Sequence, residues 1–522
     1  MAAEVELKLL VAPEDLARIE HHPALRELRP WGSRTERLAT TYYDTPDFDL
    51  ARDGVALRVR RNGEQWIQTL KGGGDSAAGL HSRDEIEWPL ATGDPDLEEL
   101  DRTPYHKLFG RAALRNRLRP VFTTEFDRAA RMLSFADGTA AELAIDRGEI
   151  RAGERTAPIS EAEIELKTGD AQRLFELARE LARDVPLRLG HASKAERGYA
   201  LARDAAAPPQ KARAVELVQW QPAGAALRRI ALACVTQMQA NEEGMLEGRD
   251  PEYLHQLRVG LRRLRSCMGL VGMVVGKEAV APLAAELRWL GGALGPARDW
   301  DVFTTETLAR LGREFPRVEG LRAFRARCAY LRRVHGEAAR AAVRSPRYTG
   351  LLLALGQAFA RDDLAGFRRP VEAAGADPPL HPHRTPSTPV VEFAAFVLDR
   401  RNRQLRKRGA EVPDATPEQR HQARIAAKKL RYAAEFFGSL YPPKQIRRYV
   451  RALEDIQDIL GAVNDSVVIG RLLEEVAGAG KKPAAPRVDG LVRGWAAAAA
   501  RHELARYDRA WEAFGDAKRF WR

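Results

Sequence analysis

Two short runs of alternating charged residues could hold a metal ion beside a phosphate group. Residues 4–8 read Glu-Val-Glu-Leu-Lys, and residues 163–167 read Glu-Ile-Glu-Leu-Lys. Every second side chain of an extended chain points the same way, so each run would present two carboxylates and one amine on one face. Carboxylate oxygens are the ligands that Mg²⁺ and Mn²⁺ prefer, and a lysine supplies a point charge for a phosphate oxygen. A solvated strand face is the alternative for either run alone.

Further segments of the first 200 residues carry like charges at every second position. Arg58 and Arg60 would share one face, as would Glu85 and Glu87. If these faces lined the inside of a closed barrel, the cationic strands could hold a polyanion while the acidic strands held the metal that bridges it. The sequence therefore predicts a polar tunnel, and a barrel whose charged face is merely solvated is the alternative.

The elements that must position these residues are short segments of alternating apolar and polar residues, separated by turn residues. They span residues 39–44, 55–61, 65–71, 83–90, 121–131, 140–146 and 162–167. This pattern predicts antiparallel strands that close on themselves, with helices at 13–22 and 171–184. Two adjacent prolines mark residues 204–213 as a linker. Beyond the linker the pattern is helical, with a proline-rich junction at 368–389.

The charge is divided unevenly over a chain that, at 522 residues, is too long for one ordinary core. Residues 1–210 carry 31 Lys and Arg against 37 Asp and Glu, whereas residues 211–522 carry 53 against 35. The basic part implies an anionic partner: nucleic acid, a membrane surface or a phosphate polymer. Three cysteines far apart in the sequence are typical of reduced core thiols in a cytosolic protein. No stretch predicts a signal peptide or a membrane helix.

The basic part contains an internal repeat. Residues 255–265 align without gaps on residues 421–431, at an offset of 166. The same offset places Asp299 on Asp465 and the pair Leu294-Gly295 on Leu460-Gly461. One offset that serves two separated motifs predicts a duplicated helical hairpin.

Each copy of the repeat carries a basic stripe along one side of its expected helix. At about 100° per residue, an arc of roughly 80° contains His255, Arg258, Arg262 and Arg265, and the second copy repeats the arrangement. Like charges at this spacing destabilise an isolated helix by a few tenths of a kcal/mol per pair. An anionic ligand that lies across both stripes would remove this repulsion. The alternative is a structural helix whose arginines meet carboxylates such as Asp299 and Asp465.

Residues 1–203 resemble the CYTH domain, or triphosphate tunnel metalloenzymes. The motifs that carry the resemblance are the Glu-x-Glu-x-Lys opening, Tyr43-Asp44-Thr45, Leu57-Arg-Val-Arg60, Thr69-Leu-Lys71, Glu85-x-Glu87, Asp146, Glu163-x-Glu165 and Ser193-Lys194. The resemblance implies an α+β domain, an eight-stranded antiparallel tunnel with flanking helices, which binds triphosphate and hydrolyses it with Mg²⁺ or Mn²⁺.

The resemblance also implies roles for particular residues. The phosphate oxygens would be gripped by Lys8, Arg58, Arg60, Lys71, Arg128 and Lys194. One or two metal ions would be held by Glu4, Glu6, Asp146, Glu163 and Glu165, with Glu85 and Glu87 supporting the tunnel wall. No Gly-x4-Gly-Lys-Ser/Thr loop occurs in the sequence, which argues against a P-loop ATPase.

Residues 214–516 resemble the CHAD domain, on the His-x2-Arg-x3-basic-basic-x-Arg pattern and the Leu-Gly-x3-Asp segments of the repeat. The resemblance implies an all-α domain of two pseudo-symmetric four-helix bundles, about residues 215–367 and 390–516, whose basic groove binds inorganic polyphosphate. The implied ligand-binding residues are His255, Arg258, Arg262, Arg263, Arg265, His421, Arg424, Lys428, Lys429 and Arg431. The second copy has lysines where the first has Arg262 and Arg263, which keeps the charge but not the bidentate geometry.

Together these features predict an inorganic triphosphatase, a metal-dependent hydrolase that cleaves triphosphate to diphosphate and phosphate, joined to a polyphosphate-binding domain. The alternatives are a non-catalytic polyphosphate-binding or targeting protein, an enzyme acting on thiamine or nucleoside triphosphates, and a helical domain that binds nucleic acid, which we favour less. We expect a cytoplasmic monomer or weak oligomer without membrane contact, with attachment to polyphosphate granules left open.

Overall fold

The computed structural model describes residues 4–522 apart from 29, 206, 362, 368–384 and 480–485. The side chains of residues 4, 73–76 and 81–84 also lie outside the description. Contacts divide the chain into two compact units: unit 1 comprises Met1–Pro209 and Arg344–Arg361, and unit 2 comprises Gln210–Val343 and Asp362–Arg522. Residues 207–218, within and after the expected linker, form neither helix nor strand, and most of the proline-rich junction lies outside the described residues.

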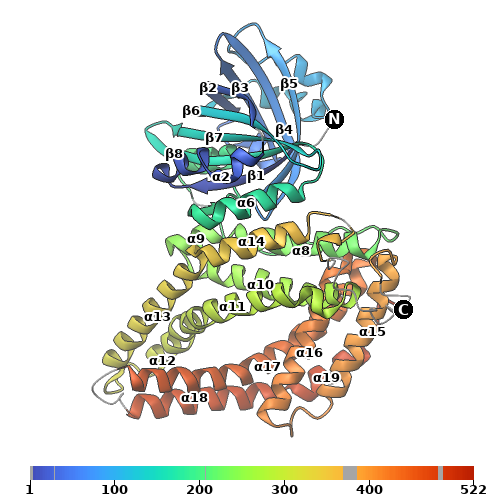
Figure 1. The fold of residues 1–522 in the computed structure, drawn as a ribbon. Coiled ribbons are helices and arrows are strands. Elements are labelled where there is room, and N and C mark those ends of the chain that lie inside the picture. Colours follow the sequence, from blue (N-terminus) through green and yellow to red (C-terminus); the bar gives the residue numbers. More distant parts are fainter. Residues whose placement is uncertain (1–3, 29, 206, 362, 368–384, 480–485) are drawn as a thin grey trace. The chain divides into compact units, whose positions relative to one another are not determined.

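Unit 1 is built around an antiparallel sheet that closes on itself (Figure 1). Its strands are β1 (Glu4–Val11), β2 (Trp31–Asp44), β3 (Val55–Asn62), β4 (Gln65–Ala77), β5 (Leu80–Leu90), β6 (Arg119–Ser134), β7 (Ala140–Ala152), β8 (Arg155–Thr168) and β9 (Leu187–Leu189). The order is β5-β4-β3-β2-β6-β7-β8-β1-β9, and a further pairing of β5 with β1 closes the ring. The described sheet thus has nine strands where the resemblance implied eight, because the short β9 pairs with the second half of β1.

Helices pack against the ring in unit 1, most of them on its outside. They are α1 (Leu16–Glu20), α2 (Pro23–Glu27), α3 (Asp49–Arg52), α4 (His106–Phe109), α5 (Ala112–Arg115), α6 (Gln172–Asp184), α7 (Lys194–Arg203) and α14 (Pro346–Ala358). Leu57 and Leu70 of neighbouring strands are buried with Leu100 and Phe109 from this covering layer. The outward face of the strands is therefore apolar, which leaves the inward face to the charged residues.

Helix α7 closes one end of the ring. Its Tyr199 packs edge-to-face on Phe122 of β6, with ring centroids 5.0 Å apart, and belongs to a buried cluster with Ile150 and Ile159. The helix begins with a capping box in which Ser193 accepts from the backbone N–H of Glu196. Because Lys194 is the first residue of the helix, this cap fixes where its side chain enters the ring.

Unit 2 is helical in the part of it that the structure describes. Its helices are α8 (Ala223–Gln239), α9 (Glu242–Glu247), α10 (Pro251–Val274), α11 (Lys277–Val302), α12 (Leu308–Glu314), α13 (Leu321–Arg344), α15 (Val390–Gly409), α16 (Pro417–Phe436), α17 (Pro443–Gly478), α18 (Pro486–Leu504) and α19 (Tyr507–Asp516). The two copies of the repeat form the antiparallel pairs α10/α11 and α16/α17. The division into two four-helix bundles stays a prediction. Among the described helices none is long and apolar enough to cross a membrane.

Candidate functional site

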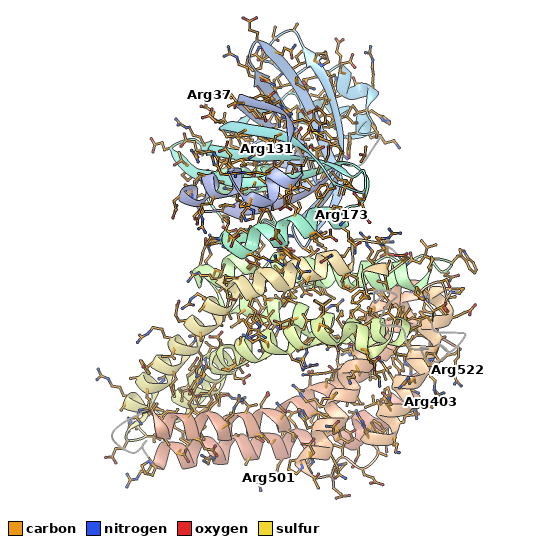
Figure 2. The ribbon with its side chains drawn as sticks, in the orientation of Figure 1. Arg37, Arg131, Arg173, Arg403, Arg501 and Arg522 are labelled. Atoms are coloured by element: carbon orange, nitrogen blue, oxygen red, sulfur yellow. The ribbon has the colours of Figure 1, made fainter. Side chains whose placement is uncertain are left out.

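A cavity of about 380 Å³ lies inside the ring of unit 1. The charged residues that line it are Glu6, Lys8, Arg34, Arg58, Arg60, Lys71, Glu85, Glu87, Arg128, Glu142, Glu163, Glu165, Lys167 and Lys194. Each comes from the inward face of a strand, apart from Lys194 at the start of α7. By contrast, Arg37 and Arg131 lie on the outside of the sheet (Figure 2), where Arg131 donates to the carbonyl of Glu20 at 2.5 Å.

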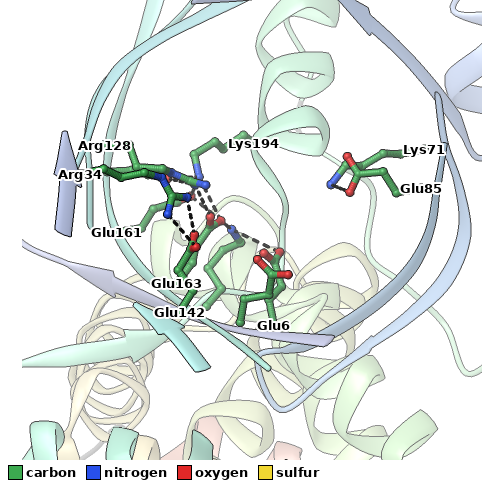
Figure 3. Close-up of polar contacts among 12 residues, drawn as sticks. Glu6, Arg34, Lys71, Glu85, Arg128, Glu142, Glu161, Glu163 and Lys194 are labelled. Carbon is green, nitrogen blue, oxygen red and sulfur yellow. Dashed lines mark hydrogen bonds and ion pairs between the residues drawn. The ribbon is translucent and has the colours of Figure 1, made fainter. Parts of the chain in front are cut away.

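On one wall of the cavity, three cations meet three buried carboxylates (Figure 3). Arg128 donates from Nε to Asp146 Oδ1 at 2.7 Å and from Nη2 to Glu163 at 2.6 Å. Lys194 Nζ lies 2.7 Å from Asp146 and 3.0 Å from Glu163, and it also pairs with Glu161. Lys8 pairs with Glu163 and lies 3.2 Å from Glu161. Strand register produces this cluster, because Lys8 is opposite Glu163 and Asp146 is opposite both Arg128 and Glu161.

The groups of this wall are held in their charged forms. Burial opposes the charge of Lys8, but Glu163, Glu161 and Glu6 outweigh it and raise the pKa of the lysine above its ordinary value. Burial likewise opposes ionisation of Glu163, yet Lys194, Lys8 and Arg128 hold the pKa of this carboxyl well below its usual range. Lys8 and Glu163 are therefore both charged at neutral pH.

The other wall carries a second set of braced cations. Arg58 Nη2 lies 2.9 Å from Glu85 Oε1, and Lys71 Nζ lies 2.9 Å from the second oxygen of the same carboxylate. Glu87 accepts from the hydroxyl of Thr69 at 2.9 Å. One glutamate thus fixes two cations that point into the cavity.

Arg60 differs from the other inward cations. It makes no ion pair among the residues that the structure describes, and its buried Nε has no hydrogen-bond partner. Burial, together with the charges of Arg58 and Arg128, lowers the pKa of Arg60 to about 10. A buried guanidinium beside two others is an unfavourable arrangement that an anion in the cavity would relieve.

The expected residues of unit 1 divide into those that the structure brings together and those that it does not. Lys8, Arg128, Lys194, Asp146 and Glu163 share one wall, and Arg58, Lys71 and Glu85 share the other. Glu6 and Glu165 lie opposite each other in the β1–β8 pairing, one pleat away from the three-carboxylate cluster. The side chain of Glu4 lies outside the described residues.

Sequence reasoning missed two residues of this site, Glu161 and Arg34. Glu161 is completely buried between Lys8, Lys194 and Arg197, and Arg197 Nη1 lies 2.9 Å from it. Arg34 also lines the cavity. The signal for Glu161 was present, because it continues the two-residue period of Glu163 and Glu165 toward the start of the strand.

Asp146, Glu161 and Glu163 could hold a metal ion, since each offers a carboxylate oxygen and these oxygens lie within 4.8 Å of one another. An all-oxygen anionic donor set fits Mg²⁺ or Mn²⁺. The set differs from the expected one by including Glu161. All three carboxylates already contact lysines or arginines, so a metal ion would share them with these cations.

In unit 2 the basic stripes of both repeats meet. Lys428 of α16 lies close to Arg262 and Arg258 of α10. Burial lowers the pKa of Lys428 most, and the charges of Arg424, Arg262 and Arg258 lower it further, to about 7. The Nε atoms of Arg258 and Arg262 are buried without a hydrogen-bond partner, and neither arginine forms an ion pair with a described residue. The four residues therefore form one basic patch contributed by two helices, which we call the central basic patch (Arg258, Arg262, Arg424 and Lys428). The two aspartates of the repeat lie close by, because the charge of Asp299 acts on Arg258 and that of Asp465 acts on Arg424 and Lys428.

Glycines allow these arginines to lie against the neighbouring helices. A Cβ added to Gly295 of α11 would lie 3.4 Å from Arg258 Nη1, and one added to Gly461 of α17 would lie 3.1 Å from Arg424 Nη1. The two contacts are related by the offset of 166 residues found in the sequence. The two copies of the repeat therefore share side-chain contacts as well as residue types.

The other basic residues of the repeat are placed differently. Arg263 is buried and lies 2.5 Å from Glu435, so this pair joins α10 to α16, and Glu435 also contacts Arg431 of its own helix at 3.0 Å. Burial and Arg298 hold the pKa of His255 below its ordinary value, so this imidazole is neutral at neutral pH. Three further basic residues of the repeat are exposed: Arg265, His421 and Lys429.

The protein therefore combines two domains: a closed tunnel lined with charged residues and a helical domain with a repeated basic stripe. Residues 2–199 match the CYTH domain family and residues 229–474 match the CHAD domain family. The chain therefore has a CYTH domain followed by a CHAD domain.

Similar proteins include an inorganic triphosphatase of Haemophilus influenzae, 36% identical over 203 residues, which are 38% of this chain and 55% of that protein. The chain thus matches about half of the length of this relative. An uncharacterized protein of Mycobacterium tuberculosis is 28% identical over 465 residues, 84% of this chain and 81% of that protein. The crystal structure of a CHAD domain from the plant Ricinus communis covers 60% of this chain and 98% of its own, with 33% identity and a TM-score of 0.50.

Proposed function

We propose that the CYTH domain hydrolyses inorganic triphosphate to diphosphate and phosphate with the help of Mg²⁺ or Mn²⁺, and that the CHAD domain binds inorganic polyphosphate. The observation that carries the first half is Arg60, a half-buried residue with a buried Nε that faces the cavity beside Arg58 and Arg128 and forms no ion pair with a described carboxylate. A phosphate chain is the kind of ligand that would occupy such a position.

The residues of the cavity would act mainly by position and charge. Phosphoryl transfer needs neutralisation of the phosphate oxygens and alignment of the attacking and leaving groups more than it needs a covalent intermediate. Arg58, Arg60 and Lys71 would hold the chain from one wall, and Lys8, Arg128 and Lys194 from the other. Because both walls are braced by carboxylates, the cations would not have to reorganise when the substrate arrives.

A metal ion held by Asp146, Glu161 and Glu163 would supply further charge neutralisation at a phosphate oxygen. The same carboxylates would orient the attacking water. Since the pKa of Glu163 is held well below its usual range by Lys194 and Lys8, despite burial, this carboxylate is a weak base that positions water better than it removes a proton.

The test is phosphate release by the purified protein from triphosphate, ATP, thiamine triphosphate and long-chain polyphosphate, with and without Mg²⁺ or Mn²⁺. We expect metal-dependent release that is fastest with triphosphate. Arg60→Gln removes no ion pair and should lower kcat/KM by about a hundredfold, as the loss of one preorganised donor does. Arg37→Gln, on the outer face, is the matched control. Absence of release from all four substrates would favour the non-catalytic alternative.

The second half of the proposal rests on the central basic patch. Four cations from two helices lie together, and two of them have buried Nε atoms without a hydrogen-bond partner in the part of the chain that the structure describes. Long-chain polyphosphate should bind the intact protein, and Arg258→Gln with Arg424→Gln should remove most of that binding. Duplex DNA is the competitor to include, because phosphate contacts dominate binding of either polymer. Displacement of polyphosphate by DNA at equal phosphate concentration would favour the nucleic-acid alternative.

A further inference from the structure

Arg34 is a cavity residue that none of the motifs of the chain includes. It lies near the start of β2, on the same side of the strand as Glu36 and the buried Thr40. Arg37, three residues later, faces the opposite side and is exposed. Arg34 therefore belongs to the inward set of cations, although its strand begins earlier than the sequence predicted.

Two carboxylates brace Arg34 without using all of its donors. Its Nη1 and Nη2 each donate to one oxygen of Glu142 at 3.0 Å, and Nε lies 3.4 Å from Glu36. A guanidinium has five N–H groups, so two remain without a partner among the described residues. Two carboxylates also hold Arg128, with Nε and Nη2 on Asp146 and Nη2 on Glu163. Such bracing leaves a guanidinium preorganised to donate to a phosphate.

Arg34 lies at the open end of the ring. Helix α7 closes the end at which Phe122 and Ile159 lie, and on β8 the inward residues run from Ile159 through Glu163 to Lys167 at the other end. Side-chain exposure rises along this direction, from 2% at Lys8 and 17% at Arg128 to 36% at Lys167 and 42% at Arg34. Arg34 lies beyond Arg128 on this path, and Figure 3 shows the two side chains extending from the same wall.

The open end of the cavity lining offers charge, and an exposed aromatic residue, Trp31, begins β2 beyond Arg34, with its indole N–H donating to Ser134 Oγ at 3.3 Å. Tyr42 and Phe126 are the aromatic residues in the described lining, and Phe126 lies under the inner cations, 5.6 Å from Arg128 Cζ and 5.1 Å from Lys194 Nζ. A further phosphate group would find the two remaining N–H groups of Arg34.

We propose that Arg34 is a further phosphate-binding residue, which contacts the outermost phosphate of the bound chain and lets the tunnel accept linear polyphosphates longer than triphosphate. Tetraphosphate is the shortest such substrate. The proposal rests on the proposed hydrolysis of triphosphate and adds the length of chain that the same cavity holds.

Initial rates with linear triphosphate and tetraphosphate in saturating Mg²⁺ or Mn²⁺ test this proposal. For Arg34→Gln we expect KM for tetraphosphate to rise about tenfold, because one charge-assisted contact is lost. We expect kcat to stay within twofold of the wild type, and KM for triphosphate to rise less than threefold. Arg34→Lys should recover part of the loss, and Arg37→Gln on the outer face should match the wild type. Thermal unfolding of each variant shows whether Glu142 tolerates the loss of its partner.

Equal effects of Arg34→Gln on the two substrates, or failure of the wild type to hydrolyse tetraphosphate while it hydrolyses triphosphate, would overturn the proposal. Calorimetric titration of tetraphosphate into the wild type and the Arg34→Gln variant measures binding separately from turnover. A wild type that hydrolyses neither substrate would count against the proposed enzymatic function, whereas the titration would still decide whether Arg34 binds the chain. Equal tetraphosphate affinity of the two proteins would remove Arg34 from the site.

Discussion

At the scale of single residues, Glu161 tests whether the acidic cluster is needed for turnover. It is completely buried and contacts Lys8, Lys194 and Arg197. Glu161→Gln should therefore lower the free energy of unfolding by about 3 kcal/mol, because it leaves buried cations less well paired, and should reduce metal-dependent phosphate release at least a hundredfold. Denaturant unfolding and a release assay measure the two effects. Glu154→Gln, in the exposed turn before β8, is the control, and full activity of the Glu161 variant would exclude this residue from the site.

Lys428 gives the central basic patch a dependence on pH. Burial, Arg424 and Arg262 lower the pKa of this lysine to about 7, so it is protonated below pH 7 and loses its charge as the pH rises through that value. A bound polyanion favours the charged form, and binding therefore takes up a proton. We expect the Kd for polyphosphate to rise up to about tenfold between pH 6 and pH 8. Lys428→Arg should flatten this profile, and a wild-type Kd that is constant over the range would refute the assignment.

The sequence predicted individual side chains where a two-residue period was enough. Lys8, Arg58 and Glu163 have the predicted inward orientation, because the alternation of a half-buried strand fixes the face that each presents. The sequence did not predict Glu161 and Arg34 as site residues, because their role depends on which strand lies opposite. The register of the β7–β8 hairpin places Glu161 across from Asp146, and the length of β2 brings Arg34 into the cavity.

At the scale of elements, the start of α7 should affect catalysis through Lys194. Ser193 and Glu196 form a capping box, and Lys194 is the first residue of the helix. Ser193→Ala should cost about 1 kcal/mol of stability and, by loosening the placement of Lys194, should raise KM for triphosphate. The matched control is Thr416→Ala, which removes the capping box of α16 in the helical domain. It should cost similar stability and leave triphosphate kinetics unchanged, and equal kinetic effects of both variants would contradict the prediction.

Element boundaries were harder to predict than element types. The expected strand at 39–44 is the second half of β2, which begins at Trp31, and the expected strand at 121–131 is extended at both ends in β6. The first part of β2 is exposed on both faces, so it lacks the apolar alternation that reveals a strand. Helix α14 lies within the residues that match the CHAD family, yet its Thr349 donates to the carbonyl of Leu187 in β9 and the helix packs as part of unit 1.

At the scale of the whole molecule, the uneven charge separates two kinds of anion binding that can be tested against each other. The double variant Arg258→Gln/Arg424→Gln should lose most polyphosphate binding and keep triphosphate hydrolysis, whereas Arg60→Gln should do the reverse. The reason is that the patch and the tunnel share no residue, and each holds cations that form no ion pair with a described carboxylate.

Binding to an open basic patch releases counterions, so polyphosphate affinity should fall steeply between 50 and 200 mM salt, roughly as it does for nucleic-acid ligands. KM for triphosphate inside the braced cavity should change less over the same range. Polyphosphate binding that survives the double variant would place the polymer elsewhere on the chain, and a parallel loss of both activities in either variant would show that the two domains act as one site.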